Sequence, residues 1–369
     1  MKIFCNFILL IFYAKFIFTK YLQRQGDKMN QLILKKCALC VAIAGVIAGG
    51  GLVGCGDSNL IAAPTLSVIS SKAEHVTGGS ALINIALPEN GGANSLLVAS
   101  LNGVDVSSAF KIDPNKPGYL IGKLTDLTVG QNTLTASYGG ATATVQLTNY
   151  PITGPVLSGP AITPFICQTQ NFTLPDGTKL GTATDANCSA PTKINYVYRS
   201  TAGGALVSLP TTTALPTDIA MTTTTTGTTV PFVVRVETGT MDRGIYQNAV
   251  LHDPTKDGTP SPTTPPKGWN KRLIANHGSG CAGGWYLQGG AQGVNPLTGD
   301  NITRLSEGYG IFINSLNHPT NSCNAQLAGE ATMMGKENFI KTYGLPTYTV
   351  SSGCSGGAYT SLQVADAFP

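Results

Sequence analysis

The residues best suited to chemistry stand near the C-terminus, where an extended run meets a glycine-rich turn and then a helix-like segment. The run PTYTVSS ends at Ser352, the turn GCSGG covers residues 353–357, and AYTSLQVADAF follows. A GxSxG sequence between a strand and a helix is typical of a nucleophile elbow, a tight bend that lifts a serine hydroxyl clear of the backbone. The pattern therefore predicts Ser355 as a catalytic nucleophile.

The motif alone is weak, because the chain contains 44 glycines and a chance match is not rare. Its context strengthens the prediction. Gly353 and Gly357 stand where a tight bend requires small residues, and β-rich sequence precedes the turn. The alternative interpretation is a structural Gly-Ser turn without a chemical role.

A second glycine-rich segment, HGSGCAGG from His277, follows the apolar run RLIANH. In enzymes with this elbow, the backbone N–H after the nucleophile and an N–H from a loop after an earlier strand bind the oxyanion. These roles predict Gly356 as the first donor and Gly278 or Ser279 as the second. A phosphate-binding loop is the alternative, but the GK[ST] ending and the GxGxxG spacing are absent.

The four histidines of the chain all precede Ser355. In this class of hydrolase the general base follows the serine and the acid in chain order, so His277 is expected in the oxyanion loop and not as the base. The acid and the histidine are accordingly expected beyond residue 369. On this interpretation the sequence is the front part of a hydrolase and is inactive by itself.

The elements around these motifs alternate between strand and helix. Short apolar strands are expected at RLIANH, at GIFINSL from Gly310 and at PTYTVSS, with a helix over LAGEATMMGKENFIKTYG between the last two. Such alternation favours a mostly parallel α/β sheet. Residues 269–369 are therefore predicted to form the N-terminal part of an α/β-hydrolase-like domain, incomplete as it stands.

The preceding sequence divides by composition. Residues 65–150 carry six short runs rich in Val, Ile, Leu and Thr, with turn signals at Asn102-Gly103 and Gly139-Gly140, and predict an immunoglobulin-like β-sandwich. Residues 151–268 are rich in Pro and Thr and read as a connecting region with some strands. Within it, PFVVRVETGTMDRGIYQNAVL is expected to supply outer strands of the next sheet. His75 and His252 are expected in turns or loops, without a catalytic role.

The N-terminus has the order of a secretion signal. From Met29, Lys35 and Lys36 precede an apolar run that ends at Leu-Val-Gly-Cys55, so residues 29–54 are expected to be a signal peptide. The ending resembles a lipoprotein signal, which implies lipid attachment at Cys55 and a linker over 55–64. The alternative is an uncleaved membrane anchor with an incidental cysteine. Residues 1–28 are expected to be mistranslated upstream sequence.

Composition narrows the function classes. Only 11% of residues are charged, and residues 1–54 hold seven of the 23 basic residues and one of the 19 acidic ones. The remainder, with 16 basic and 18 acidic residues, gives no electrostatic footprint for nucleic acid. An outer-membrane or cell-surface lipoprotein is the expected location, with a periplasmic or secreted protein as the alternative.

Export would place the remaining cysteines in an oxidising compartment. Local order suggests the pairs Cys167–Cys188 and Cys281–Cys323, although four cysteines allow three pairings. Cys354 is left over. Metal-ligand spacing is absent, and neither a metal nor a cofactor is expected.

The segments LNGVDVSSAF, NYPITGPVLSGP, ETGTMDRGIYQNAVLHDP and MMGKENFIKTYGLPTYTVSSGCSGGAYTSLQVADAFP resemble a family of uncharacterised exported bacterial proteins with a domain of unknown function and an α/β-hydrolase end. The resemblance covers the chain from about Thr65 and implies a serine-hydrolase fold and a truncated chain. Separately, Gly353-Cys354-Ser355 is similar to the tannase and feruloyl esterase pattern. That similarity implies a disulfide from Cys354 to a cysteine beside the catalytic histidine.

Two functions follow as hypotheses. The first is a lipid-anchored or secreted serine hydrolase acting on a small-molecule or polymeric carboxylic ester, with a lipid anchor as its membrane contact. The second is a surface lipoprotein without catalytic activity that binds a ligand or polymer through the β domain. A truncated and unstable gene product is also compatible with the sequence, since a parallel sheet cut after its nucleophile strand exposes an apolar edge.

Overall fold

A computed structural model of the 369-residue chain describes residues 62–88, 97–280, 287–289 and 295–367. All of these belong to one unit of the chain, Leu60–Pro369. The predicted signal peptide, the lipidation residue Cys55 and the predicted disulfide partner Cys281 lie outside the described residues. In the part that is described, every helix is too short or too polar to cross a membrane.

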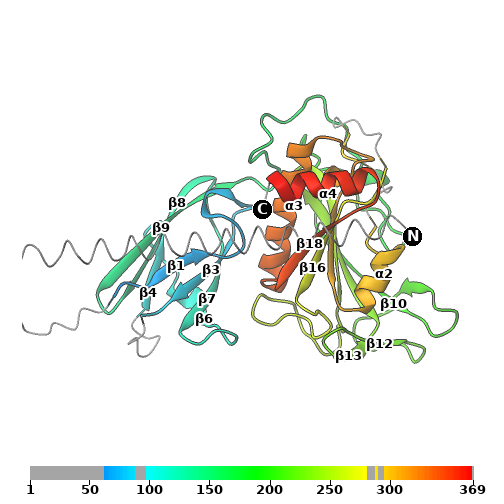
Figure 1. Ribbon diagram of the computed structural model, residues 1–369, viewed down its shortest axis with the longest axis horizontal. Coiled ribbons are helices and arrows are strands. Elements are labelled where there is room, and N and C mark those ends of the chain that lie inside the picture. Colours follow the sequence, from blue (N-terminus) through cyan, green and yellow to red (C-terminus); the bar gives the residue numbers. More distant parts are fainter. Residues whose placement is uncertain (1–61, 89–96, 281–286, 290–294, 368–369) are drawn as a thin grey trace, which may run out of the picture. The chain divides into compact units, whose positions relative to one another are not determined.

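Residues 65–150 form two β-sheets around one apolar core (Figure 1). One sheet has the order β1-β3-β7-β6 and the other β2-β9-β8-β4-β5. The strands are β1 (Thr65–Val68), β2 (Val76–Thr77), β3 (Ala81–Ala86), β4 (Leu97–Leu101), β5 (Val104–Asp105), β6 (Phe110–Ile112), β7 (Tyr119–Leu124), β8 (Gly130–Tyr138) and β9 (Ala141–Tyr150). Alternation directs residues such as Leu134, Ala136 and Tyr138 of β8 into the core. All six predicted strand segments are confirmed as strands.

The two predicted turns are confirmed. Gly139 and Gly140 have φ angles of 55° and 88°, and they join β8 to β9 with Tyr138 opposite Ala141. Asn102 and Gly103, with φ angles of 52° and 83°, join β4 to β5 in the same way. A two-residue hairpin turn with both central φ angles positive suits the twist of the strands, and Gly and Asn adopt it most readily.

The second half of the chain is built on a seven-stranded sheet with the order β11-β10-β14-β15-β17-β16-β18. Strand β16 is parallel to its neighbours β17 and β18, whereas the other neighbouring pairs are antiparallel. A separate hairpin pairs β12 with β13. The strands are β10 (Lys193–Arg199), β11 (Leu206–Ser208), β12 (Met221–Thr223), β13 (Thr229–Pro231), β14 (Val233–Met241), β15 (Gly244–Leu251), β16 (Arg272–Asn276), β17 (Gly310–Asn314) and β18 (Tyr348–Ser352).

The prediction that PFVVRVETGTMDRGIYQNAVL supplies outer strands is wrong. It forms β14 and β15, which lie in the middle of the sheet, and every residue of β15 is buried. The sheet therefore runs across the boundary predicted at residue 268. β15 is buried on both faces although it contains Gln247 and Asn248, and periodicity alone does not tell which strands are neighbours.

Among the described residues, three α-helices accompany this sheet: α2 (Asp300–Ser306), α3 (Ala325–Tyr343) and α4 (Gly356–Ala367). Short 3-10 turns lie at Ala73–His75, Ser107–Ala109, Thr169–Asn171 and Ser315–Asn317. Helix α3 begins after Asn324, whose side chain accepts hydrogen bonds from two backbone N–H groups of the first turn. Its residues Met334, Phe339 and Tyr343 pack against the sheet in one apolar cluster with Phe312.

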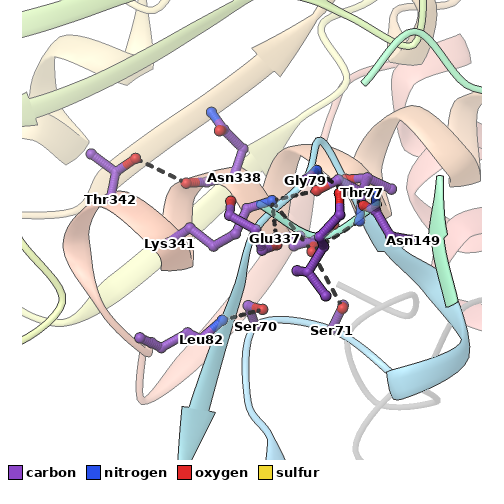
Figure 2. Close-up of polar contacts among 12 residues, drawn as sticks. Ser70, Ser71, Thr77, Gly79, Leu82, Asn149, Glu337, Asn338, Lys341 and Thr342 are labelled. Carbon is purple, nitrogen blue, oxygen red and sulfur yellow. Dashed lines mark hydrogen bonds and ion pairs between the residues drawn. The ribbon is translucent and has the colours of Figure 1, made fainter. Parts of the chain in front are cut away.

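A buried ion pair on α3, formed by Glu337 and Lys341, is hydrogen-bonded to β2 of the N-terminal sheets (Figure 2). Thr77 donates through Oγ1 to Glu337 Oε2 at 2.5 Å and through its backbone N–H to Oε1 at 3.2 Å. Lys341 Nζ lies 3.4 Å from Glu337 Oε1 and donates to the carbonyl of Thr77 at 2.8 Å. Burial raises the pKa of Glu337 and lowers the pKa of Lys341, and the pairing opposes both shifts. The close hydrogen bonds offset part of the desolvation of these charges.

A buried carboxylate of α3, that of Glu330, holds residues 157–158 against this helix. Glu330 accepts hydrogen bonds from the backbone N–H of Leu157 and, at 2.6 Å, from that of Ser158, whose hydroxyl donates at 3.0 Å. Asp242, in the turn between β14 and β15, faces Glu330 and is 3% exposed. Burial and the neighbouring Glu330 raise the pKa of Asp242, and the cation of Arg243 only partly opposes them. Asp242 therefore keeps its proton to a higher pH than an exposed aspartate does.

The Asp242→Asn variant should be more stable than the wild type at alkaline pH. A group whose pKa is higher in the folded protein contributes stability that is present at low pH and lost as pH rises through the folded value. We expect the melting temperature of the variant, relative to the wild type, to rise as the pH increases from about 4, the usual pKa of an aspartate, toward the higher folded value. Asp176→Asn is the control: hydrogen bonding by Thr178 lowers the pKa of Asp176, so its carboxylate stays charged above about pH 4 and the relative melting temperature of this variant should change only at lower pH. Parallel pH profiles for wild type and Asp242→Asn would contradict this.

Candidate active site

Ser355 is the last residue of the turn that joins β18 to α4. Its φ angle is 55°, in the left-handed region that residues other than glycine seldom adopt. The residue is exposed, and α4 begins at Gly356 immediately after it. A sharp strand-to-helix bend with a positive φ at an exposed serine is the backbone geometry of a nucleophile elbow.

The turn lies directly against the loop that follows β16. Beyond the paired strands, His277 N donates to Ser352 O at 2.7 Å, and Cys354 N donates to Gly278 O at 2.8 Å. A Cβ at Gly357 would overlap the Gly278 carbonyl, and a Cβ at Gly353 would lie 2.8 Å from Gly357 Cα. The two glycine-rich segments predicted to cooperate are therefore in contact. Glycine at 353 and 357 is what allows the approach.

His277 is buried beneath this contact and links the ends of three strands. Its Nδ1 lies 3.1 Å from the carbonyl of Asn317, after β17, and its Nε2 lies 2.8 Å from Ser351 Oγ, in β18. Burial lowers the pKa of His277 to about 4, so the ring is neutral at neutral pH. Both ring nitrogens are occupied by these partners, which gives His277 a positioning role in the loop.

The two candidates for the second oxyanion donor differ in their hydrogen bonds. Gly278 N donates to Asn276 Oδ1 at 2.6 Å, so this N–H already has a strong acceptor. Ser279 N lies 3.4 Å from His318 Nε2, a long separation for an N–H···N hydrogen bond. Ser279 therefore has the more available N–H of the two.

The ring of His318 is a second reason why the Ser279 N–H is more available than the Gly278 N–H. Thr320 N donates to His318 Nδ1 at 3.2 Å, and burial lowers the pKa of His318, which favours the neutral ring. A neutral imidazole accepts at one nitrogen and donates at the other. If Nδ1 accepts from Thr320, Nε2 carries the proton and does not accept from Ser279. Among the described residues of this loop, the Ser279 N–H is then without an acceptor.

The residues that the sequence interpretation missed are Asn276, Asn317 and His318. They fix the loop conformation through the contacts described above. The signal was present, because Asn and His cluster directly after β16 (ANHG) and after β17 (NSLNHP). Polar residues at the carboxyl ends of neighbouring parallel strands gather at one edge of the sheet, where ligands bind in α/β folds.

A general base for Ser355 is not found among the histidines of the described residues. His252 Nε2 lies 2.8 Å from the carbonyl of Gly258, and His277 and His318 have the partners given above. None of the hydrogen bonds within the described ranges joins a histidine to the Ser355 side chain. Within the same ranges, no group of three or more His, Cys, Asp or Glu residues is arranged to hold a metal ion.

The cysteines behave partly as predicted. Cys167 and Cys188 form a disulfide with a Cα–Cα distance of 5.2 Å, which confirms the first pairing. The second involves Cys281, which lies outside the described residues, and its predicted partner Cys323 donates from Sγ to the carbonyl of Pro319 at 3.3 Å. Cys354 is an exposed thiol beside Ser355.

Comparison with known proteins gives one family match. The sequence model of a tannase-like family of unknown function (DUF6351) matches residues 66–369. Curated proteins gave no match. Among solved structures, titin M4 is 18% identical over 24% of this chain and 96% of its own, with a TM-score of 0.17. The tandem Ig repeats of Dlar are 12% identical over 50% of this chain and 94% of their own, with a TM-score of 0.20. Scores this low carry no argument about fold.

Proposed function

We propose that this chain, which belongs to the tannase-like family of unknown function DUF6351, carries the nucleophile of an α/β-type serine hydrolase that acts on carboxylic esters. The observation that carries the proposal is Ser355, an exposed serine with a φ of 55° on a strand-to-helix bend. The contact between that bend and the loop after β16, which begins with His277 and Gly278 and is called the HG loop below, supports the proposal. The description of the family as tannase-like supports an ester substrate in particular.

The chemistry assigned to the chain is attack and charge stabilisation. Ser355 Oγ loses its proton to a base and bonds to the ester carbonyl carbon, whose oxygen takes up the negative charge. Gly356 N–H, in the first turn of α4, has no intrahelical acceptor and donates to this oxyanion. Ser279 N–H is the second donor. The bond to the alcohol then breaks, and water hydrolyses the acyl-serine.

A fluorophosphonate probe tests the nucleophile directly. Attack by the serine hydroxyl forms an O–P bond and releases fluoride, which leaves a stable adduct. We expect the full-length protein to be labelled, with the adduct mapped by fragmentation mass spectrometry to Ser355. Pretreatment with a reagent that blocks the Cys354 thiol distinguishes labelling of Ser355 from labelling of Cys354. Labelling confined to Cys354, or none at all, would rule out the proposed role of Ser355.

A further inference from the structure

A pocket of about 410 Å³ lies where the loop after β1 approaches α3 and the end of α4. It is separate from the elbow, because Val364 on its wall lies eight residues along α4 from Gly356, or about 12 Å at the helical rise. This volume falls within the usual range for small-molecule sites. None of the roles assigned above involves this pocket.

One part of the pocket wall is apolar. Helix α3 contributes Met333 and Ile340, which share a helix face at a spacing of seven residues, and α4 contributes Val364. Ile69, Leu157 and Leu345 complete the apolar lining. Ile340 and Val364 are at most 5% exposed, so the back of the pocket is formed by well-packed core residues. Such a wall removes the apolar part of a ligand from water.

The ionisable side chains of the lining are all basic. They are Lys72 and His75, from the loop after β1, and Lys336, from the same face of α3 as Met333 and Ile340. Neither lysine belongs to an ion pair among the described residues, and no carboxylate lines the pocket. Both lysines are exposed and lie beside the apolar part of the lining. A ligand with a negative charge would neutralise them.

The loop side of the pocket is held in place. Ser70 Oγ accepts a hydrogen bond from Leu82 N at 3.1 Å, and Ser71 Oγ lies 3.1 Å from Lys72 O and 3.4 Å from Glu337 Oε1, either of which can accept its proton. Figure 2 shows both serines beside the α3 residues that bind Thr77. The pocket is therefore formed before a ligand arrives, which lowers the entropic cost of binding.

We infer that this pocket binds an amphiphilic carboxylate, with its apolar body against Met333, Ile340 and Val364 and its carboxylate between Lys72 and Lys336. Decanoate is the probe of this chemistry. Decyltrimethylammonium has the same chain with a positive head group, and butyrate has the same head group without the apolar body.

Isothermal titration with these three probes tests the inference. We expect decanoate to bind, and the two control compounds to bind at least about tenfold more weakly. The double variant Lys72→Met and Lys336→Met keeps the side-chain stems and should lower decanoate affinity at least about tenfold. Lys111→Met, an exposed lysine of β6 outside the pocket, is the matched control and should leave the affinity unchanged.

Two further arms separate the outcomes. Ser355→Ala should bind decanoate as the wild type does, so that failure of the proposed esterase activity and failure of this pocket are distinguishable. Melting temperatures establish that the lysine variants are folded. No binding of decanoate, equal binding of decyltrimethylammonium, or wild-type affinity in the folded double variant would each overturn the inference.

Discussion

Replacing Ser355 with alanine is expected to reduce ester hydrolysis by the full-length protein at least about 10³-fold, because removing the nucleophile leaves only binding and oxyanion stabilisation. The measurement is kcat/KM on a chromogenic short-chain ester. The loss should fall on kcat, since the hydroxyl that makes the covalent bond contributes little to holding the substrate. Stability should change little, because Ser355 is exposed.

Two neighbouring variants serve as controls for this loss. Ser352→Ala removes a hydroxyl three residues earlier, also exposed, and should retain activity. Cys354→Ala removes the adjacent thiol and distinguishes a serine from a cysteine nucleophile. Hydrolysis that survives in Ser355→Ala but disappears in Cys354→Ala would transfer the nucleophile to the thiol.

Gly357→Ala should disable the same site without touching the nucleophile. The added methyl would overlap the Gly278 carbonyl and lie 3.1 Å from the His277 carbonyl, so α4 must move away from the loop. That movement separates the Gly356 and Ser279 N–H groups from each other. A displacement of about 1 Å in a catalytic group costs about 10²-fold, and we expect at least that loss in the rate of fluorophosphonate labelling.

The stability of Gly357→Ala should fall by about 1–3 kcal/mol, the usual cost of an extra carbon in a packed contact. Ala358→Gly, the reverse exchange at the next and exposed position of α4, is the matched control. It should lose about 1 kcal/mol through helix propensity alone and keep its labelling rate. Normal labelling of Gly357→Ala would mean that the packing of elbow against loop is irrelevant to the reactivity of Ser355.

The elements that carry the candidate site could be predicted from local sequence. The strand at Tyr348–Ser352, the bend at Ser355 and the helix that follows were marked by a β-rich run, a glycine pair and a helix-forming segment. The HG loop was found because it follows a short apolar strand. In each instance the signal lay within about ten residues of the feature itself.

Features that depend on distant partners could not be predicted in this way. The choice between Gly278 and Ser279 rests on Asn276 Oδ1 and on the ring of His318, which is a matter of side-chain geometry. The central position of β14 and β15 depends on which strand each one pairs with, and their sequences are compatible with several neighbours. The burial of Asp242 against Glu330 was hidden in a short polar turn.

The ion pair of Glu337 and Lys341 bears on how this protein would transmit force. Its partners on β2 include the backbone of Thr77, so a pull applied to the N-terminal sheets reaches α3 through short, buried hydrogen bonds. Helix α3 packs in turn on the strand that precedes His318. The ion pair thereby limits how far the N-terminal sheets can rotate relative to α3 and the seven-stranded sheet.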